Sequence, residues 1–369
     1  MARKLKSDRV LFVTVMVLLA ASVVMVYSAS AIVAQEKLGN ATFYAERQAV
    51  FILLGVVGMA IAMNVDYSHY RHPRVIGAVL GLTVAALILV LLIGPEIKGG
   101  RRWFSIGGFG IQPSELAKIA MILFTAYILD RRMDRIADVR YSLLPVGAVL
   151  AVVLALILAG RDLGTSVAIF GTVAVMVFAA GLPYKYLAWL SAAALPVLTF
   201  LVVGSDYRWK RITAFLNPEA DPRGTGFQII QSKIAVATGG VTGVGLGDSV
   251  QKRFYLPESH NDFIFAVISE EAGLIGATVT LLCFAVIVWR GLRTVLRAPD
   301  RFAALTALGL TMMIGAQGFV NMSVVLGLLP TKGIPLPLVS YGGSSTLVGL
   351  AAIGMLLNIS QHASAEEWE

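Results

Sequence analysis

The sequence has a single cysteine, Cys283, in 369 residues. A disulfide needs two thiols and a cysteine metal site needs several, so neither is expected within one chain. The four histidines, His69, His72, His260 and His362, show no HExxH-type spacing, which argues against a zinc site. Walker, GxGxxG nucleotide-binding and GxSxG nucleophile motifs are also missing. The chain therefore lacks the signatures of nucleotide-driven, zinc-dependent and serine-hydrolase chemistry.

Charge is scarce as well. Only 14% of the residues are charged, 57% are hydrophobic, and the mean hydropathy is +0.79. Soluble domains have about 25% charged and about 45–50% apolar residues. The net charge of +8 could suit nucleic acid, but the basic residues are scattered in short connections between apolar runs, a pattern typical of topology signals facing anionic lipid. We predict a membrane protein that contacts lipid and does not bind nucleic acid.

Apolar stretches long enough to cross a bilayer as helices recur along the chain. Helices are expected because each one satisfies its own backbone hydrogen bonds in lipid. The fold class is therefore an all-α polytopic membrane protein with about ten transmembrane helices. The first run is too long for the core of a signal peptide, so it is expected to be retained. The predicted spans are 10–34, 45–64, 75–94, 114–130, 142–159, 165–181, 186–204, 263–289, 303–328 and 344–360.

The connections between spans predict the orientation. Lys and Arg gather in alternate connections, which places both termini in the cytoplasm. Residues 1–369 are expected to form one integral membrane domain, with residues 205–262 as a large extracytoplasmic loop inside it. A flexible linker is the alternative for this loop, but its apolar content argues against that. Residues 226–237 predict an amphipathic helix on the membrane surface, whose apolar face comprises Phe227, Ile230, Ile234 and Ala237.

Two groups of charged residues lie where apolar helices are expected to begin. Glu258, His260 and Asp262 precede one apolar run, and Glu115 and Lys118 open another. Charged side chains in membrane segments are costly, so they are functional candidates. Glu115 and Lys118 are three residues apart and can pair on one helix face. The alternatives are a helix-cap role for Asp262 and a purely structural ion pair.

Two predicted outer connections carry further candidates. The loop at 95–113 places Arg102 among glycines, where a guanidinium suits phosphate oxygens, although an interfacial anchor explains the loop equally well. A very short turn at 159–166 holds Asp162 between two apolar runs, and a helix-cap role is the alternative.

The segment 329–345 combines prolines with a Gly–Ser cluster before the last apolar run. Irregular backbone at membrane depth is tolerated only inside protein or beside a polar cavity. The N–H groups of such a turn can receive an anion, so the segment is a candidate binding element, with a simple helix break as the alternative. Its candidate residues are Lys332, Ser340, Gly342, Gly343 and Ser344.

Five motifs resemble a known family. They are QPSELAK (112–118), RDLGTS (161–166), FLNPEADPRGTGFQIIQSKIA (215–235), YLPESHNDFIFAVISEEAG (255–273) and LPLVSYGGSS (336–345). Together they resemble the shape, elongation, division and sporulation (SEDS) family, in family order and over essentially the whole chain. Two segments, GVGLGDSVQKRFYLPE (243–258) and LPTKGIP (329–335), resemble its division branch more than its elongation branch.

The resemblance implies a ten-helix glycosyltransferase of the bacterial inner membrane. Such proteins polymerise lipid II, a disaccharide-pentapeptide on an undecaprenyl pyrophosphate carrier, together with a class B penicillin-binding protein and other division proteins. The resemblance makes Asp262 the catalytic residue; the family commonly has Thr just before it, where this chain has Asn261. The predicted substrate-binding residues are Arg102, Glu115, Lys118, Asp162, Arg211, Glu258, His260, Lys332, Ser340, Gly342, Gly343 and Ser344.

Polymerisation requires attack by a sugar hydroxyl on an anomeric carbon while pyrophosphate leaves. A partly buried carboxylate can take the hydroxyl proton. Cations must meet the leaving group, and Arg102, Arg211 and Lys332 are the candidates. A divalent cation, Mg²⁺ or Mn²⁺, could share that task, although the sequence contains no dedicated cage and no residue is assigned to a metal. One essential carboxylate fits an inverting displacement better than a double displacement.

Two other classes of protein fit parts of the pattern. A flippase that moves lipid II across the bilayer would also place polar residues in its spans. Against it, the sequence has no inverted repeat and its charged residues concentrate on the predicted outer side. A scaffold that only anchors a partner synthase leaves the charged pair and Asp262 unexplained.

Overall fold

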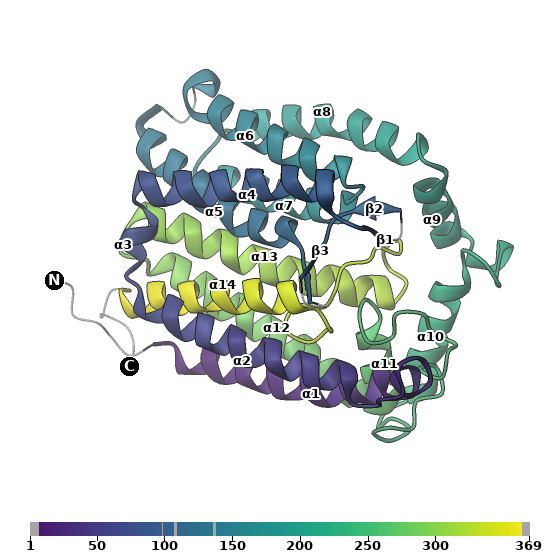
Figure 1. Ribbon diagram of the computed structural model, residues 1–369. Coiled ribbons are helices and arrows are strands. Elements are labelled where there is room, and N and C mark those ends of the chain that lie inside the picture. The colour runs from purple at the N-terminus through teal and green to yellow at the C-terminus, as the bar shows by residue number, and fades with distance from the viewer. Residues whose placement is uncertain (1–6, 98, 107–108, 136–137, 364–369) are drawn as a thin grey trace.

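The computed structural model describes residues 7–97, 99–106, 109–135 and 138–363. Long helices dominate it (Figure 1). They are α1 (Arg9–Leu38), α2 (Phe43–Asn64), α4 (Pro73–Ile93), α5 (Pro113–Arg132), α6 (Val139–Ala159), α7 (Leu163–Ala179), α8 (Tyr184–Val203), α12 (Gly273–Leu296), α13 (Arg301–Val325) and α14 (Gly343–Gln361).

Short elements fill the connections. They are the helices α3 (Tyr67–Tyr70), α9 (Asp206–Leu216), α10 (Phe227–Gly239) and α11 (Ile264–Glu271), the 3₁₀ turns η1 (Met133–Arg135) and η2 (Pro218–Ala220), and the strands β1 (Glu96–Ile97), β2 (Gly100–Arg101), β3 (Phe104–Ile106) and β4 (Phe109–Ile111). The strands pair as two antiparallel hairpins, β1 with β2 and β3 with β4, in the connection before α5.

Each of the ten predicted spans coincides with a helical run, so the all-α polytopic fold is confirmed. Seven helices among the described residues are long and apolar enough to cross a membrane: α1, α2, α4, α6, α12, α13 and α14. One predicted span, 263–289, is divided at Gly273 into α11 and α12. The exposed carbonyls at the end of α11 are satisfied from outside the helix, because Val244 N and Gly245 N donate to Glu270 O and Glu271 O.

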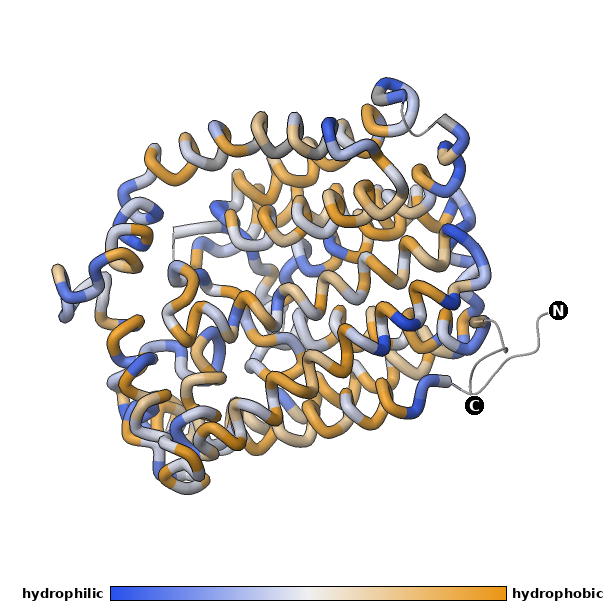
Figure 2. The backbone as a smooth tube through the Cα atoms, turned by 180° about the vertical axis from the view of Figure 1, so that it is seen from behind, coloured by the Kyte–Doolittle hydropathy of each residue, from blue (hydrophilic) through white to orange (hydrophobic). Residues whose placement is uncertain are grey.

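The helices alternate in direction, so the two ends of the chain meet. Figure 1 shows the start of α1 and the end of α14 at one end of the bundle, and α9, α10 and α11 at the other. Asp8 N donates to Ser360 Oγ at 3.3 Å, which ties the first helix to the last. Hydrophobic residues colour the middle of the bundle and hydrophilic residues gather at its two ends (Figure 2). A membrane slab therefore fits between the two ends.

Helices α2 and α14 pack side by side in parallel, and glycines make the close approach possible. A β-carbon built on Gly343 would lie 2.3 Å from the Phe51 ring, and one on Gly55 would lie 2.5 Å from Leu350 Cδ1. Further along, a β-carbon on Gly354 would meet a backbone carbonyl of α2 at 2.5 Å. Small residues let helices in lipid approach this closely and gain dispersion contacts and hydrogen bonds.

The long connection 205–262 is folded against the bundle. Helix α10 forms as predicted, and its backbone touches α11 so closely that a β-carbon on Gly239 would lie 1.9 Å from Ser269 O. Ser232 Oγ donates to the last turn of α13, at Val325 O. Ile234, on the predicted apolar face, points away from the protein and is 41% exposed. The packing of α10 on α11 and α13 argues against a flexible linker, and part of the predicted apolar face is exposed, at Ile234 and Ala237.

Candidate functional site

Asp262 lies one residue before the N-cap of α11. The N-cap residue of α11 is Phe263, and no side chain makes a capping hydrogen bond there. Asn261 donates instead to the Glu258 carboxylate at 2.7 Å. The N-cap position of α11 thus belongs to Phe263, and a role of the Asp262 carboxylate as the base stays a prediction.

The connection between α13 and α14, residues 326–342, lies directly on the Asp262 segment; we refer to it as the return loop. A β-carbon built on Gly333 would lie 2.9 Å from Asp262 Oδ2. Ser340 Oγ donates to Asn261 O at 2.6 Å, and Tyr341 N donates to His260 O at 3.0 Å. The return loop thus holds three consecutive residues of the segment that carries the candidate base.

Lys332 on the return loop and Asp162 at the start of α7 interact electrostatically. Burial lowers the pKa of Lys332 from its ordinary value, and the Asp162 carboxylate opposes that shift. Asp162 caps α7 by accepting from Thr165 N at 3.0 Å, and it also accepts from Gln112 Nε2 at 3.0 Å. The capping interpretation of Asp162 is confirmed, and the charge of the cap also faces the Lys332 ammonium.

The two candidate arginines are engaged with backbone carbonyls. Arg102 donates to Gly160 O at 2.8 Å and to Arg161 O at 2.7 Å, so it braces the turn before α7. Arg211, on α9, donates to Thr331 O at 3.2 Å and so reaches the return loop. Both guanidiniums are half-buried and keep further N–H groups, which suits them to receive an anion.

The Gly–Ser cluster at the start of α14 bonds within the protein. Ser344 Oγ accepts from Gln112 N and donates to Gly110 O, both at 3.0 Å. Gly342 N donates to Gln48 Oε1. These contacts fix the return loop to α2 and to the start of α5. A role in substrate binding for Ser340, Gly342, Gly343 and Ser344 stays a prediction.

Glu115 and Lys118 form an ion pair near the start of α5. Lys118 Nζ lies 2.8 Å from Glu115 Oε1, and each residue is only 6% exposed. The ammonium also donates to Gln317 Oε1 on α13 at 2.9 Å. The predicted pair is therefore confirmed. Its described partners are protein groups, and a direct contact with substrate stays a prediction.

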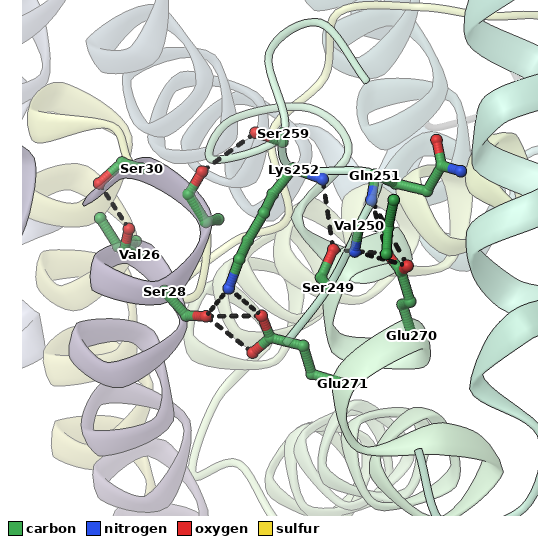
Figure 3. A network of polar contacts seen from close by, with 11 residues as sticks. Val26, Ser28, Ser30, Ser249, Val250, Gln251, Lys252, Ser259, Glu270 and Glu271 are labelled. Carbon is green, nitrogen blue, oxygen red and sulfur yellow. Dashed lines mark hydrogen bonds and ion pairs between the residues drawn. The ribbon is translucent and has the colours of Figure 1, made fainter. Parts of the chain in front are cut away.

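A second buried network anchors the segment that leads to Asp262 (Figure 3). Lys252 Nζ lies 2.7 Å from Glu271 Oε1 and donates to Ser28 Oγ on α1 at 3.0 Å. The neighbouring Glu270 carboxylate accepts from Ser249 Oγ at 2.5 Å. Neither glutamate is among the residues that the sequence predicts for the site. Here they fix residues 249–252 to α11 and α1.

Backbone strain borders the site. Arg161, Glu258 and Leu338 are non-glycine residues with φ of 64°, 57° and 65°. Each left-handed conformation costs of order 1–3 kcal/mol and persists only where the surroundings enforce it. All three residues lie in the segments that carry Asp162, Asp262 and the return loop. Such strain clusters at functional sites, which supports assigning the site to this end of the bundle.

Sequence reasoning missed several neutral amides that organise the site: Gln48, Gln112, Gln317 and Asn321. They carry no charge, so the search for charged residues in apolar runs passed over them. A usable signal existed, because Asn and Gln in membrane helices commonly hydrogen-bond to another segment.

The long apolar helices define a multi-pass membrane protein. Its candidate site, which contains a carboxylate and cations, lies at one end of the helix bundle. The chain belongs to the family FTSW_RODA_SPOVE, described as Cell cycle protein, whose model matches residues 8–365. The SEDS resemblance is thereby confirmed.

Curated relatives cover the same length. A Geobacter sulfurreducens protein named "Probable peptidoglycan glycosyltransferase FtsW" is 46% identical over 356 residues, which are 96% of this chain and 95% of the relative. Stage V sporulation protein E of Bacillus subtilis is 43% identical over 361 residues, 98% of this chain and 99% of the relative. The resemblance to the division branch is therefore confirmed as well.

Solved structures share the fold. A chain from a structure described as "Structural coordination of polymerization and crosslinking by a peptidoglycan synthase complex" superposes with a TM-score of 0.79 at 32% identity, covering 96% of this chain and 97% of that chain. Rod shape determining protein RodA of Thermus thermophilus gives a TM-score of 0.71 at 28% identity, covering 96% of each chain.

Proposed function

We propose that this peptidoglycan glycosyltransferase polymerises lipid II at the outer face of the bacterial cytoplasmic membrane, with both termini in the cytoplasm. The activity class follows from the family and from the curated names of its relatives. The observation that carries the site assignment is the Asp262 carboxylate lying against the loop that bears Lys332. A carboxylate base beside a loop that carries an ammonium group suits a reaction that removes a proton and releases an anion.

In the proposed reaction, Asp262 accepts the proton of the acceptor sugar hydroxyl. The hydroxyl oxygen forms a bond to the anomeric carbon of the donor sugar as the bond from that carbon to the pyrophosphate oxygen breaks. The bonding electrons leave with undecaprenyl pyrophosphate, and the anomeric centre is inverted. Partial burial favours this role, because a carboxylate with reduced solvation is a stronger base.

The leaving pyrophosphate gathers negative charge, which Lys332 and Arg211 are placed to meet. Arg211 is hydrogen-bonded to the return loop, so the two cations belong to one unit. Arg102 braces the neighbouring turn and offers its remaining N–H groups. A divalent cation, Mg²⁺ or Mn²⁺, would be bound chiefly by pyrophosphate oxygens. Within the described residues, no group of three or more His, Cys, Asp or Glu could hold a metal ion.

A class B penicillin-binding protein is the proposed partner, because a structural neighbour comes from a complex that coordinates polymerisation with crosslinking. We place its membrane helix on the exposed apolar faces of α12 and α13. Leu282 and Trp289 on α12 are 56% and 59% exposed, and Phe319 on α13 is 37% exposed. Other division proteins are expected to join the complex.

The test is the Asp262→Asn variant, purified with its partner and given lipid II. Asn keeps the size of the side chain but cannot take the proton, so glycan synthesis should fall by roughly 10²–10⁴-fold. Folding and partner binding should be unchanged, because Asn has the same size as Asp and caps a helix about as well. Glycan chains on a gel at near-normal yield would remove Asp262 from the mechanism. Lipid II flipping without any polymerisation, in the unmodified protein, would support the transporter alternative instead.

A further inference from the structure

Two amide side chains of α13 join the return loop to the Asp262 segment. Gln317 and Asn321 are four residues apart and lie on one face of the helix. Asn321 Nδ2 donates to the backbone carbonyls of Asp262 at 2.8 Å and Ile334 at 2.7 Å. Gln317 Nε2 donates to the next carbonyl, Pro335 O, at 3.0 Å. Two segments far apart in sequence are thus held by one helix face.

The orientation of the Asn321 amide is forced. Both of its partners are carbonyl oxygens, which only accept, so the nitrogen must face them. The residue is 1% exposed, and its Oδ1 has no hydrogen-bond partner among the described residues. Both N–H groups are therefore used on Asp262 and Ile334. Removing them would leave two partly buried carbonyls without their donor, which costs more than an ordinary hydrogen bond where water cannot replace it.

The buried Glu115–Lys118 ion pair fixes the orientation of the Gln317 amide. Lys118 donates to Gln317 Oε1 at 2.9 Å, so the acceptor end of that amide is fixed. The donor end must then point toward Pro335. Glu115 holds the Lys118 ammonium at 2.8 Å. A continuous path of polar contacts therefore runs from the ion pair to the return loop.

We propose that Asn321 is a positioning residue that sets the spacing between Asp262 and Lys332, supported by Gln317 and the ion pair. This inference rests on the proposed function. Ile334 N donates to Lys332 O at 2.8 Å in a tight turn, so the backbone of Lys332 is fixed relative to Ile334, whose carbonyl Asn321 holds. In the proposed reaction, Asp262 takes the proton of the hydroxyl that attacks the anomeric carbon. Lys332 stabilises the pyrophosphate that leaves the same carbon. A displacement of about 1 Å between them should lower kcat about 10²-fold.

The test compares Asn321→Leu with Asn358→Leu in the full chain bound to its partner. Asn358 is a matched control: it is fully buried, its Nδ2 donates to Met63 O at 2.8 Å, and its Oδ1 accepts from Tyr67 N at 2.9 Å. It lies at the opposite end of the bundle. Both variants should lower the melting temperature, because each breaks two buried hydrogen bonds.

Only Asn321→Leu should lower kcat, about 10²-fold, with KM for lipid II changed by about twofold or less. Gln317→Leu should lower kcat about tenfold, because one carbonyl loses its donor while Asn321 keeps its own. Hydrogen exchange should rise for the amides of residues 331–341 in Asn321→Leu and stay unchanged there in Asn358→Leu. This exchange reports the position of the loop independently of catalysis.

Two results would overturn the inference: a normal kcat for Asn321→Leu, or equal losses of kcat in the Asn321 and Asn358 variants. The proposed function has a separate test. An inactive Asp262→Asn beside a fully active Asn321→Leu removes only the positioning role. A fully active Asp262→Asn removes the catalytic assignment itself.

Discussion

Gly333 lies so close to Asp262 that a β-carbon added to it would sit 2.9 Å from the carboxylate Oδ2. Few real β-carbons are found at that distance, so the return loop approaches the carboxylate as closely as a backbone without a side chain allows. The φ angle of Gly333 is outside the left-handed region, so nothing in the backbone itself demands glycine there. A side chain at position 333 is disfavoured because its β-carbon would collide with the Asp262 carboxylate.

The Gly333→Ala variant should therefore act on catalysis. Its methyl group must push either the loop or the Asp262 carboxylate aside, and we expect kcat to fall about tenfold or more with little loss of stability. Gly171→Ala in α7 is the control, because a β-carbon there meets nothing within 4 Å. Steady-state lipid II polymerisation by both variants is the measurement. A Gly333→Ala enzyme as fast as the control would mean that the contact has no catalytic role.

We expect the Glu115–Lys118 pair to contribute both to stability and to the position of the return loop. Exchanging the two charges should separate these contributions. Glu115→Lys or Lys118→Glu alone places two like charges together in the interior, which should cost at least as much as removing one partner of a buried pair, about 3–5 kcal/mol. The double exchange should recover much of that stability. Its kcat should stay low, because a carboxylate at position 118 cannot donate to Gln317, whose amide must then turn away from Pro335.

Melting temperature and polymerisation rate, measured on the same four proteins, provide the two readouts. Additive damage in the double variant would show that the two charges are not coupled. Full recovery of kcat would show that the direction of the Gln317 amide does not matter.

Lys332 should give the pH profile an alkaline limb. Its pKa lies below the ordinary 10.5 because of burial, so in the free enzyme the cation is present at lower pH and is lost as pH rises through the lowered value. The fall in kcat/KM should therefore begin below pH 10.5. In the substrate complex, pyrophosphate stabilises the ammonium, so the limb of kcat should lie at higher pH. Lys332→Arg should abolish the limb, because a guanidinium stays charged; an unchanged limb would assign it to another group.

The orientation of the chain is open to a direct test with reporter fusions. A reporter joined after Arg135 in η1 should report from the cytoplasm, and one at Thr225, before α10, from the outer side. The basic residues of alternate connections motivate this expectation. A cytoplasmic signal at Thr225 would reverse the whole assignment and place Asp262 on the wrong face for polymer export.

The spans could be predicted because bilayer thickness and backbone hydrogen bonding leave a long apolar run little choice but a helix. The division of the 263–289 span at Gly273 could not. That break depends on Val244 and Gly245, whose N–H groups satisfy the carbonyls that end α11. The donors lie in a different segment, so no local pattern near Gly273 reveals them.

For the candidate site too, the sequence predicts some features and not others. Asp262, Lys332 and the Glu115–Lys118 pair could be chosen because a charge in an apolar context is costly and needs a reason. Which of them meet could not be deduced, because Gly333 reaches Asp262 through tertiary packing. Asn321 has neither charge nor an unusual neighbourhood in sequence. Only the two carbonyls brought to it by folding give that amide its role.

The parallel packing of α2 on α14 bears on how the protein is made. Helix α2 is synthesised well before α14, which carries the two glycines that pack against it, Gly343 and Gly354. Until α14 is made, Phe51 lacks its contact with Gly343, and the bond from Gln112 N to Ser344 is missing at the start of α5. A nascent or truncated chain is thus inserted in the membrane before it has a complete site. We therefore expect glycan synthesis to begin only once α14 has packed against α2.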